Sequence, residues 1–201
     1  TLVDEQCHVE RQEYWSHYAY RIESELGVQN NSELRFTYAP EYETFSLTGL
    51  RIWRDGQWID GFTKASQQEL REEAQSRNFI YDGRKTVLVV LEDIRPGDVV
   101  EYDYLIKGDN PIFEGKFHMG FSASLAYELK HASYRVLSPE SRPLRTKVRN
   151  ADWSFAVSTE GGMTEYRLER TNIPNDEILK KTPSWYFNSP YLELNEWKDW
   201  S

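Results

Sequence analysis

The sequence contains a single cysteine, Cys7, among its 201 residues. One thiol excludes an intrachain disulfide and a thiolate metal cluster, because each of these needs at least two cysteines. No window approaches the roughly 18 consecutive apolar residues that a membrane-spanning helix requires. These absences exclude disulfide-rich scaffolds, cysteine zinc clusters and helical membrane spans within this chain.

Positive charge is also scarce. The chain has 24 Lys and Arg against 33 Asp and Glu, a formal net charge of −9. Nucleic-acid and anionic-membrane surfaces are recognised by clustered Lys and Arg, so neither is an expected partner. The sequence also has no Gly-rich phosphate loop and no dinucleotide fingerprint. We therefore expect no cofactor.

Aromatic residues and alternating segments are abundant instead. The 7 Trp, 13 Tyr and 9 Phe favour β-structure. Apolar and polar residues alternate strictly in 34–38, 144–149, 153–157 and 165–169, which predicts strands with one wet face. The turn-like spacers between the last three predict an antiparallel meander.

Three further features define the predicted sheets. The run Arg54-Asp55-Gly56-Gln57 between apolar segments predicts a tight hairpin. Residues 86–91 are apolar on both faces, which predicts a central, buried strand. After a turn at 93–98, residues 99–106 return as a strand with Glu101 and Asp103 facing outward.

Helical signal is weak. The best candidate, 64–78, has too few apolar residues for a core-facing stripe, and we interpret it as a loop with one helical turn or an irregular edge strand. From residue 171 onward, prolines interrupt the pattern and alternation is lost. The prediction is an all-β, mostly antiparallel β-sandwich or large curved sheet in one domain over 1–170, with an irregular tail over 171–201.

The candidate reactive groups favour structural roles. His8, His17, His118 and His131 have no zinc-binding spacing. Cys7 and His8 are adjacent, and neighbours on a strand point to opposite faces, so they cannot form a nucleophile pair. The run 120–124 lacks the final glycine of a nucleophile elbow. We assign no catalytic, cofactor-binding or metal-binding residue.

Two charged groups leave alternatives open. Glu101 and Asp103 share a strand face, and paired carboxylates can do acid–base work if burial raises the pKa of one of them. A plain solvated face is the simpler interpretation. Arg142, Arg145, Lys147 and Arg149 form a local basic stripe. It is either a wet strand face or a surface for an acidic partner.

The chain resembles a known family in the order and spacing of several motifs. They lie at 81–86, 96–102, 108–111 and 115–117, and later at 172–174, 183–185 and 194–200. Together they resemble the bacterial domain of unknown function that precedes a transglutaminase-like, papain-type domain in many envelope proteins. The resemblance extends from about residue 9 to the end, and no position matches the Cys-His-Asp machinery of the downstream domain.

This resemblance implies an antiparallel β-sandwich-like unit without established activity. It implies that the chain is an excised N-terminal module, that the missing transglutaminase-like domain is its partner, and that the parent protein is periplasmic or in the cell envelope. We expect a non-catalytic module that positions that domain or its peptide, protein or glycan substrate. The alternatives are a carbohydrate-binding module and a hydrolase with an unrecognised carboxylate site. The chain begins at Thr1, without Met or a leader pattern, so its cellular location cannot be read from a targeting signal.

The aromatic residues of the tail carry one more expectation. Large aromatic side chains left in water forfeit hydrophobic stabilisation, so they usually pack or bind. We expect Trp185 and Tyr186 to pack back on the sandwich. We expect Trp197 and Trp200 to be less buried, because their natural contact is the missing C-terminal domain.

Overall fold

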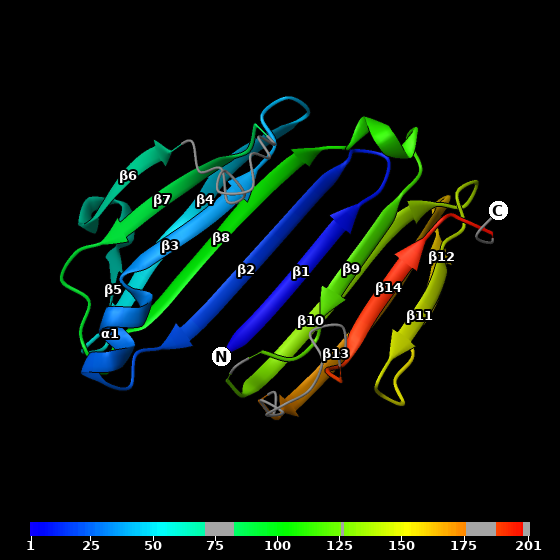
Figure 1. The fold of residues 1–201 in the computed structure, drawn as a ribbon. Helices are drawn as coiled ribbons and strands as arrows, with labels where there is room; N and C mark the ends of the chain where they lie inside the picture. Colours follow the sequence, from blue (N-terminus) through cyan, green and yellow to red (C-terminus); the bar gives the residue numbers. More distant parts are fainter. Residues whose placement is uncertain (71–82, 126, 176–187, 199–201) are drawn as a thin grey trace. The chain divides into compact units, whose positions relative to one another are not determined.

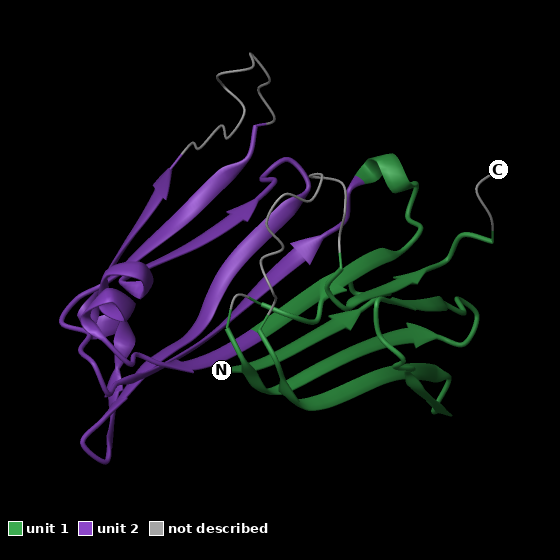
Figure 2. Cartoon of the chain, turned by 60° about the horizontal axis from the view of Figure 1, so that its bottom comes forward, with its two compact units in different colours: residues 1–16, 111–201 green, residues 17–110 purple. Residues whose placement is uncertain are grey.

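The fold is described from a computed structural model of the chain, covering residues 1–70, 83–125, 127–175 and 188–198 (Figure 1). Two compact units divide it (Figure 2). Unit 1 contains Thr1–Ser16 and Pro111–Ser201, and unit 2 contains His17–Asn110. The chain passes from unit 1 to unit 2 within strand β2 (Glu13–Arg21).

Unit 1 is built from two sheets. The first has the strand order β12 (Ala156–Glu160), β13 (Met163–Ile173), β10 (Leu129–Pro139) and β1 (Leu2–His8). Only β1 and β10 run parallel, and the other pairs are antiparallel. The second sheet has the order β11 (Arg145–Arg149), β14 (Tyr191–Asn195) and β9 (His118–Ser122), and it is antiparallel throughout. A short 3-10 turn, η3 (Pro111–Phe113), precedes β9.

Both sheets of unit 1 contribute fully buried side chains. Phe121 on β9 and Tyr134 on β10 approach with ring centroids 5.2 Å apart. Leu192 and Leu194 on β14 are completely buried. The Leu144 amide donates to the hydroxyl of Tyr166 over 2.9 Å. Alternate side chains of a strand point to opposite faces of its sheet. In unit 1, the apolar set on one face of each sheet therefore forms the core.

Unit 2 also contains strands of two sheets. Beside the later part of β2, the first sheet has the order β8 (Val99–Gly108), β4 (Glu43–Arg54) and β5 (Gln57–Asp60). The second has the order β3 (Glu33–Tyr38), β7 (Lys85–Leu91) and β6 (Ala65–Leu70). Helix α1 (Glu25–Asn31) and the 3-10 turn η1 (Gly61–Lys64) complete the unit.

One hydrophobic cluster joins the two sheets of unit 2. Phe36 on β3 lies 5.0 Å from Phe45 on β4 and 5.7 Å from Tyr102 on β8, measured between ring centroids. The buried members of the cluster come from β3, β7, β4, β8, the segment after β2 and the turn after β7: Ile22, Leu34, Phe36, Tyr38, Leu50, Ile52, Val87, Val89, Leu91, Ile94 and Val100. Unit 2 is therefore a small β-sandwich.

The predicted all-β, mostly antiparallel class is confirmed. Segment 34–38 lies in β3, and 165–169 lies in β13. The Asp55-Gly56 hairpin joins β4 to β5, with φ of 50° and 82° at its two central residues, as a tight two-residue turn requires. Strand β7 is central in its sheet, with Val87, Val89 and Leu91 buried.

Three strand predictions need correction. β11 pairs with β14 and not with β12, so the meander reduces to the hairpin β12–β13. Strand β12 begins at Ala156, after the predicted start at residue 153. Trp153 lies outside the strand, and the Arg170 guanidinium carbon lies 5.3 Å from the centroid of its ring. The segment predicted as an irregular tail contains β14 and the end of β13.

The domain organisation also differs from the prediction of one body over 1–170. Residues 111–201 group with the first sixteen residues, and 17–110 form the other unit. Of the predicted helix-or-edge segment, Ala65–Leu70 is the edge strand β6, and 71–78 lies outside the described residues. Helix α1 was not predicted; it is capped by Ser24 and buries no residue. No helix in the described parts is long and apolar enough to cross a membrane.

Candidate functional site

The only thiol is inaccessible. Cys7 lies in β1 with 6% of its surface exposed, and burial raises its pKa to about 12. The adjacent His8 instead accepts a hydrogen bond at Nδ1 from the Arg11 amide over 3.4 Å. Because the thiolate is the nucleophilic form, Cys7 is poorly suited to covalent chemistry near neutral pH.

We expect Cys7 to resist iodoacetamide in the folded chain at neutral pH. Its side chain is buried and protonated, so alkylation requires opening of unit 1. The mass shift should appear at least about a hundredfold more slowly than in guanidinium chloride, since even a local opening costing 3 kcal/mol is populated below one part in a hundred. Equal rates in both conditions would show that the thiol is accessible.

The histidines do not assemble a metal site. His17 on β2 contacts Glu101 on β8 at 2.9 Å, and His118 on β9 lies against Phe113 and Trp197. Within the described ranges, no three His, Cys, Asp or Glu side chains come close enough to hold an ion.

The run 120–124 has a structural explanation. Gly120 on β9 lies against the phenol of Tyr191, and a Cβ at Gly120 would come 2.0 Å from that hydroxyl oxygen. The Ser122 and Ser124 hydroxyls donate to the carbonyls of Ser124 and Pro174. Glycine is therefore required here for packing, not for a nucleophile elbow.

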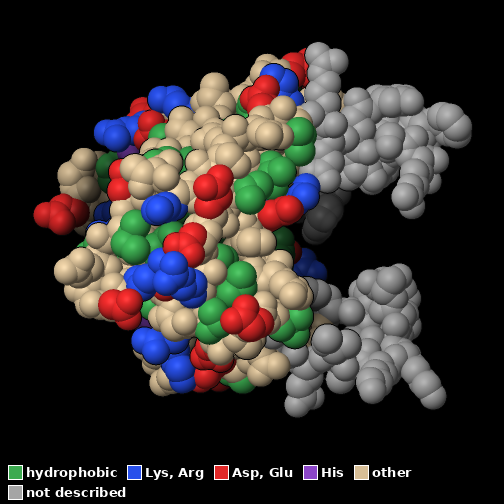
Figure 3. Space-filling view, turned by 90° about the vertical axis from the view of Figure 1, so that its left-hand side faces the viewer, with side chains coloured by type: hydrophobic (Ala, Val, Ile, Leu, Met, Phe, Trp, Pro, Cys, Tyr) green, Lys and Arg blue, Asp and Glu red, His purple; other side chains and the backbone are tan. Residues whose placement is uncertain are grey.

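The basic stripe divides into two parts. Arg145 and Lys147 are exposed on β11, and Arg149 pairs with Glu193 on β14 at 2.9 Å. Arg142 is bound elsewhere, donating to both carboxylate oxygens of Glu196. Figure 3 presents another face, the side of Figure 1 that carries α1 and β6, and there basic, acidic and hydrophobic side chains are interspersed.

Glu101 is part of a network rather than a plain wet face. It accepts from Arg51 at 2.6 Å and contacts His17 at 2.9 Å, and 15% of its side chain is exposed. Partial burial opposes its ionisation, but the hydrogen bonds from Arg51 and His17 prevail and hold the pKa of Glu101 below its ordinary value. A carboxyl with a lowered pKa is ionised at neutral pH and cannot serve as a general acid.

The Asp103 side chain on β8 packs against Thr48 and Gly49 of the neighbouring strand β4. The register of β4 and β8 shifts between Leu47 and Gly49, so Thr48 is the extra residue of a β-bulge. The Thr48 hydroxyl donates to the Asp103 carboxylate. A Cβ at Gly49 would come 2.1 Å from Oδ1 of Asp103, so only glycine leaves room for this carboxylate.

A groove of about 600 Å³ opens beside these carboxylates. It is lined by residues of β4, β5, η1 and β8, including Arg51, Trp58, Asp60, Phe62, Glu101 and Asp103. Trp58 and Phe62 expose 47% and 48% of their surfaces. The Arg51 guanidinium lies over the Trp58 ring at 4.1 Å from its centroid, and Trp53 meets Trp58 edge-on at 5.1 Å. This volume is typical of ligand pockets.

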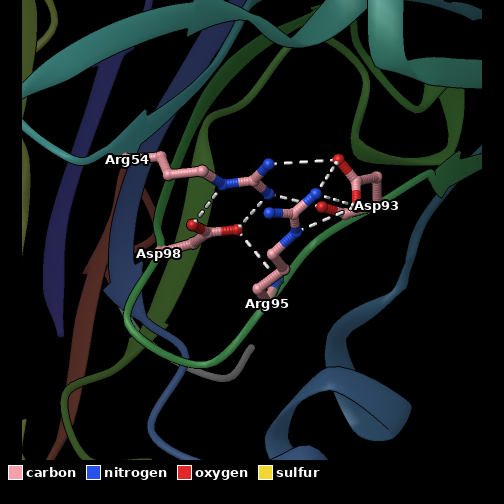
Figure 4. Close-up of polar contacts among 4 residues, drawn as sticks. All are labelled: Arg54, Asp93, Arg95 and Asp98. Carbon is pink, nitrogen blue, oxygen red and sulfur yellow. Dashed lines mark hydrogen bonds and ion pairs between the residues drawn. The ribbon is translucent and has the colours of Figure 1, made fainter.

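An ionic cluster at the turn before β8 has a structural role (Figure 4). Arg54 binds both carboxylate oxygens of Asp98 at 2.9 and 2.7 Å, and it also reaches Asp93 at 3.1 Å. The Arg95 amide donates to Asp98 over 2.8 Å. The cluster closes the predicted 93–98 turn and ties it to the end of β4.

A second candidate surface lies in unit 1, where Trp197 follows β14. Its ring centroid is 5.7 Å from that of Phe113 and 5.5 Å from that of His118. Ile112 beside them is 76% exposed. We call Ile112, Phe113, His118 and Trp197 the aromatic corner. Trp197 is partly buried, whereas Trp185, Tyr186 and Trp200 lie outside the described residues.

These features define an all-β domain with exposed aromatic surfaces and a protonated, buried thiol. The chain belongs to the DUF3857 family, a domain of unknown function with a solved structure, whose model matches residues 8–177. No match was found among curated proteins.

The fold is shared with a crystal structure described as a "putative protease" from Parabacteroides distasonis ATCC 8503. The TM-score is 0.83 at 17% sequence identity, with 98% of this chain and 39% of that chain covered. At this identity the likeness concerns the fold. The chain spans well under half the length of that protein.

Proposed function

We propose that the chain is a non-catalytic accessory module of a larger, transglutaminase-like envelope protein. It positions the downstream catalytic domain or that domain's substrate. Three things support this: membership of DUF3857, the motif order that resembles domains preceding a transglutaminase-like domain, and the greater length of the protease-like relative. A periplasmic location is part of the same proposal and follows from the resemblance.

The aromatic corner is the observation that carries this proposal. Two contacts fix the chain where it leaves β14: Glu196 accepts from the Phe117 amide over 2.6 Å, and its carboxylate holds Arg142. The residue after Glu196, Trp197, packs against Phe113 with ring centroids 5.7 Å apart. Exposed apolar groups that lie together are typical of an interaction surface. We assign the corner to the downstream domain.

We expect this corner to be covered in the parent protein. Amide hydrogen exchange of 112–118 should be slower in the parent, which carries the following domain, than in the 201-residue chain, because docking excludes water and suppresses opening. In the parent, Ile112→Ser should remove most of this protection. In the isolated chain it should change stability by less than about 0.5 kcal/mol, as at other exposed sites.

Leu26→Ser is the matched control, because Leu26 is 63% exposed on α1 in the other unit. It should leave the exchange of 112–118 unchanged. Equal exchange in the parent and in the isolated chain would refute docking at this corner. The parent sequence supplies a separate check, since a Cys, His and Asp in transglutaminase-like order after this module identify the catalytic partner.

A carbohydrate-binding module is the second candidate, favoured by exposed Trp58 and Phe62 beside hydrogen-bonding carboxylates. Titration with cellohexaose and chitohexaose, followed by tryptophan fluorescence, tests it. For the hydrolase alternative, the lowered pKa of Glu101 argues against this carboxyl as the general acid, because that acid must stay protonated.

A further inference from the structure

The groove of unit 2 has more negative than positive charge. Its charged lining residues are Asp60, Glu101, Asp103 and Arg51. Arg51 is bound to Glu101 at 2.6 Å, which matches one charge of each sign. Among the described residues, no Lys or Arg forms an ion pair with Asp60 or Asp103. The groove therefore presents two carboxylates that a cationic ligand complements.

Asp103 is held in a defined position, which favours recognition of a specific group over diffuse attraction. The bulge at Thr48 directs a hydroxyl onto its carboxylate, and Gly49 provides the space beneath it. Bulges of this kind commonly aim side chains at functional sites. A fixed carboxylate loses little freedom when it accepts a hydrogen bond from a ligand.

The aromatic walls suit the same ligand. Arg51 already shows how a guanidinium binds here, lying 4.1 Å from the centroid of the Trp58 ring and bonded to a carboxylate. Cations bind favourably over aromatic faces, and the methylene stems of Lys and Arg pack on apolar surface. Phe62, which is 48% exposed, offers a further aromatic surface in the groove.

We propose that this groove binds a basic side chain, arginine or lysine, of an extended peptide segment. A volume of about 600 Å³ has room for neighbouring groups of the peptide as well as the basic side chain. β5 is the last strand of its sheet order, so an extended peptide can add along its outer edge while a side chain enters the groove. The site extends the proposed role in substrate positioning, and it lies in the unit that does not carry the aromatic corner.

Fluorescence anisotropy of the 201-residue chain with a fluorescein-labelled peptide, Ala-Ala-Arg-Ala-Arg-Ala-Ala, tests the proposal. The same peptide with Gln for Arg should bind at least about tenfold more weakly, the loss expected for a charge-assisted hydrogen bond. Asp103→Asn should weaken binding of the arginine peptide by a similar factor. Phe62→Ala should weaken it about threefold or more, through loss of the aromatic contact.

Glu160→Gln is the matched control, because it removes the same charge from an exposed position on β12. If it weakens binding as much as Asp103→Asn, the attraction is general and the proposal fails. Equal binding of the Arg and Gln peptides also overturns it, as does binding of cellohexaose without binding of the peptide. Thermal melts confirm folding of each variant. The titration omits the downstream domain, so its failure is independent of the hydrogen-exchange test on the parent.

Discussion

Replacing Asp98 by alanine should lower the free energy of unfolding by about 3–5 kcal/mol, the usual cost of removing one partner of a buried ion pair. Asp98 is 2% exposed, and the side chain of Arg54 is 16% exposed. Without Asp98, the guanidinium keeps only its contacts with the exposed residue Asp93. A denaturant melt of Asp98→Ala measures the loss directly.

The loss includes more than one ion pair. Asp98 accepts two hydrogen bonds from Arg54 and one from the Arg95 amide, as Figure 4 shows. Its backbone carbonyl also accepts from the Ile22 amide over 2.8 Å. The same carboxylate therefore fixes the end of β4, the turn and the start of β8. Alanine leaves the backbone bonds in place but removes the group that holds the turn closed.

The effect should depend on pH in a defined direction. Hydrogen bonds from Arg54 hold the pKa of Asp98 below its ordinary value despite burial. In the unfolded chain this carboxyl titrates near pH 4, so the unfolded state binds more protons than the native state just below that pH. The contribution of Asp98 is thus complete above about pH 5, and it is lost as the pH falls through the native pKa. The difference between wild type and Asp98→Ala should narrow on acidification.

Asp93→Asn is the control for this cluster. The Asp93 side chain is 46% exposed, so its pairs with Arg54 and Arg95 are screened by water. We expect a loss of less than about 1 kcal/mol, as is usual for exposed ion pairs. Equal losses for the two variants would contradict the special role of the buried carboxylate, and so would a pH-independent difference for Asp98→Ala.

The local strand patterns could be predicted, whereas the pairing of distant strands could not. Period-2 alternation located β3 and much of β13, and the Asp55-Gly56 pair gave the β4–β5 hairpin with its register. The parallel pair β1–β10 joins residues about 129 positions apart, as between Leu2 and His131. No local signal encodes such a partner, because any half-buried strand presents the same backbone groups.

The sequence predicted part of the groove, namely its two carboxylates on one strand face, but not the residues that surround them. Glu101 and Asp103 were recognised as a pair on one face, but their environment depends on Arg51 and Thr48 of the neighbouring strand. The predicted hairpin contains a usable signal: its register sets Trp53 opposite Trp58 and Arg51 opposite Asp60. Extending that register would have placed two indoles and an Arg on one face. No recognisable sequence pattern predicts the bulge at Thr48, which positions Asp103.

Strand β14 was missed because it is short and lies among prolines and acidic residues. Yet Tyr191–Asn195 alternates, with Leu192 and Leu194 inward and the side chains between them partly exposed. Five residues are too few to distinguish a strand from a chance alternation. What fixes β14 is its position between β11 and β9, with five residue pairs on each side. Tertiary pairing, not local propensity, orders this segment.

Leu194→Ala should accordingly lower the free energy of unfolding by about 2–5 kcal/mol, as for other buried leucines. Leu194 is completely buried in the middle strand of its sheet, so truncation leaves a cavity that the paired neighbours cannot readily fill. If residues after 171 were only an irregular tail, the same change would cost less than about 0.5 kcal/mol. Urea melts of the 201-residue chain separate the two outcomes.

Lys198→Ala is the control for a change in the same segment, because Lys198 is exposed and lies after the end of β14. Lys198→Ala should leave the urea concentration at the midpoint of unfolding unchanged. Leu194→Ala should lower that concentration without changing the dependence of the unfolding free energy on urea, the m-value. A small loss for Leu194→Ala would mean that β14 is dispensable to unit 1. The aromatic corner would then lose part of its support, since Trp197 follows this strand directly and its amide donates to the Asn195 side chain at the end of β14 over 3.1 Å.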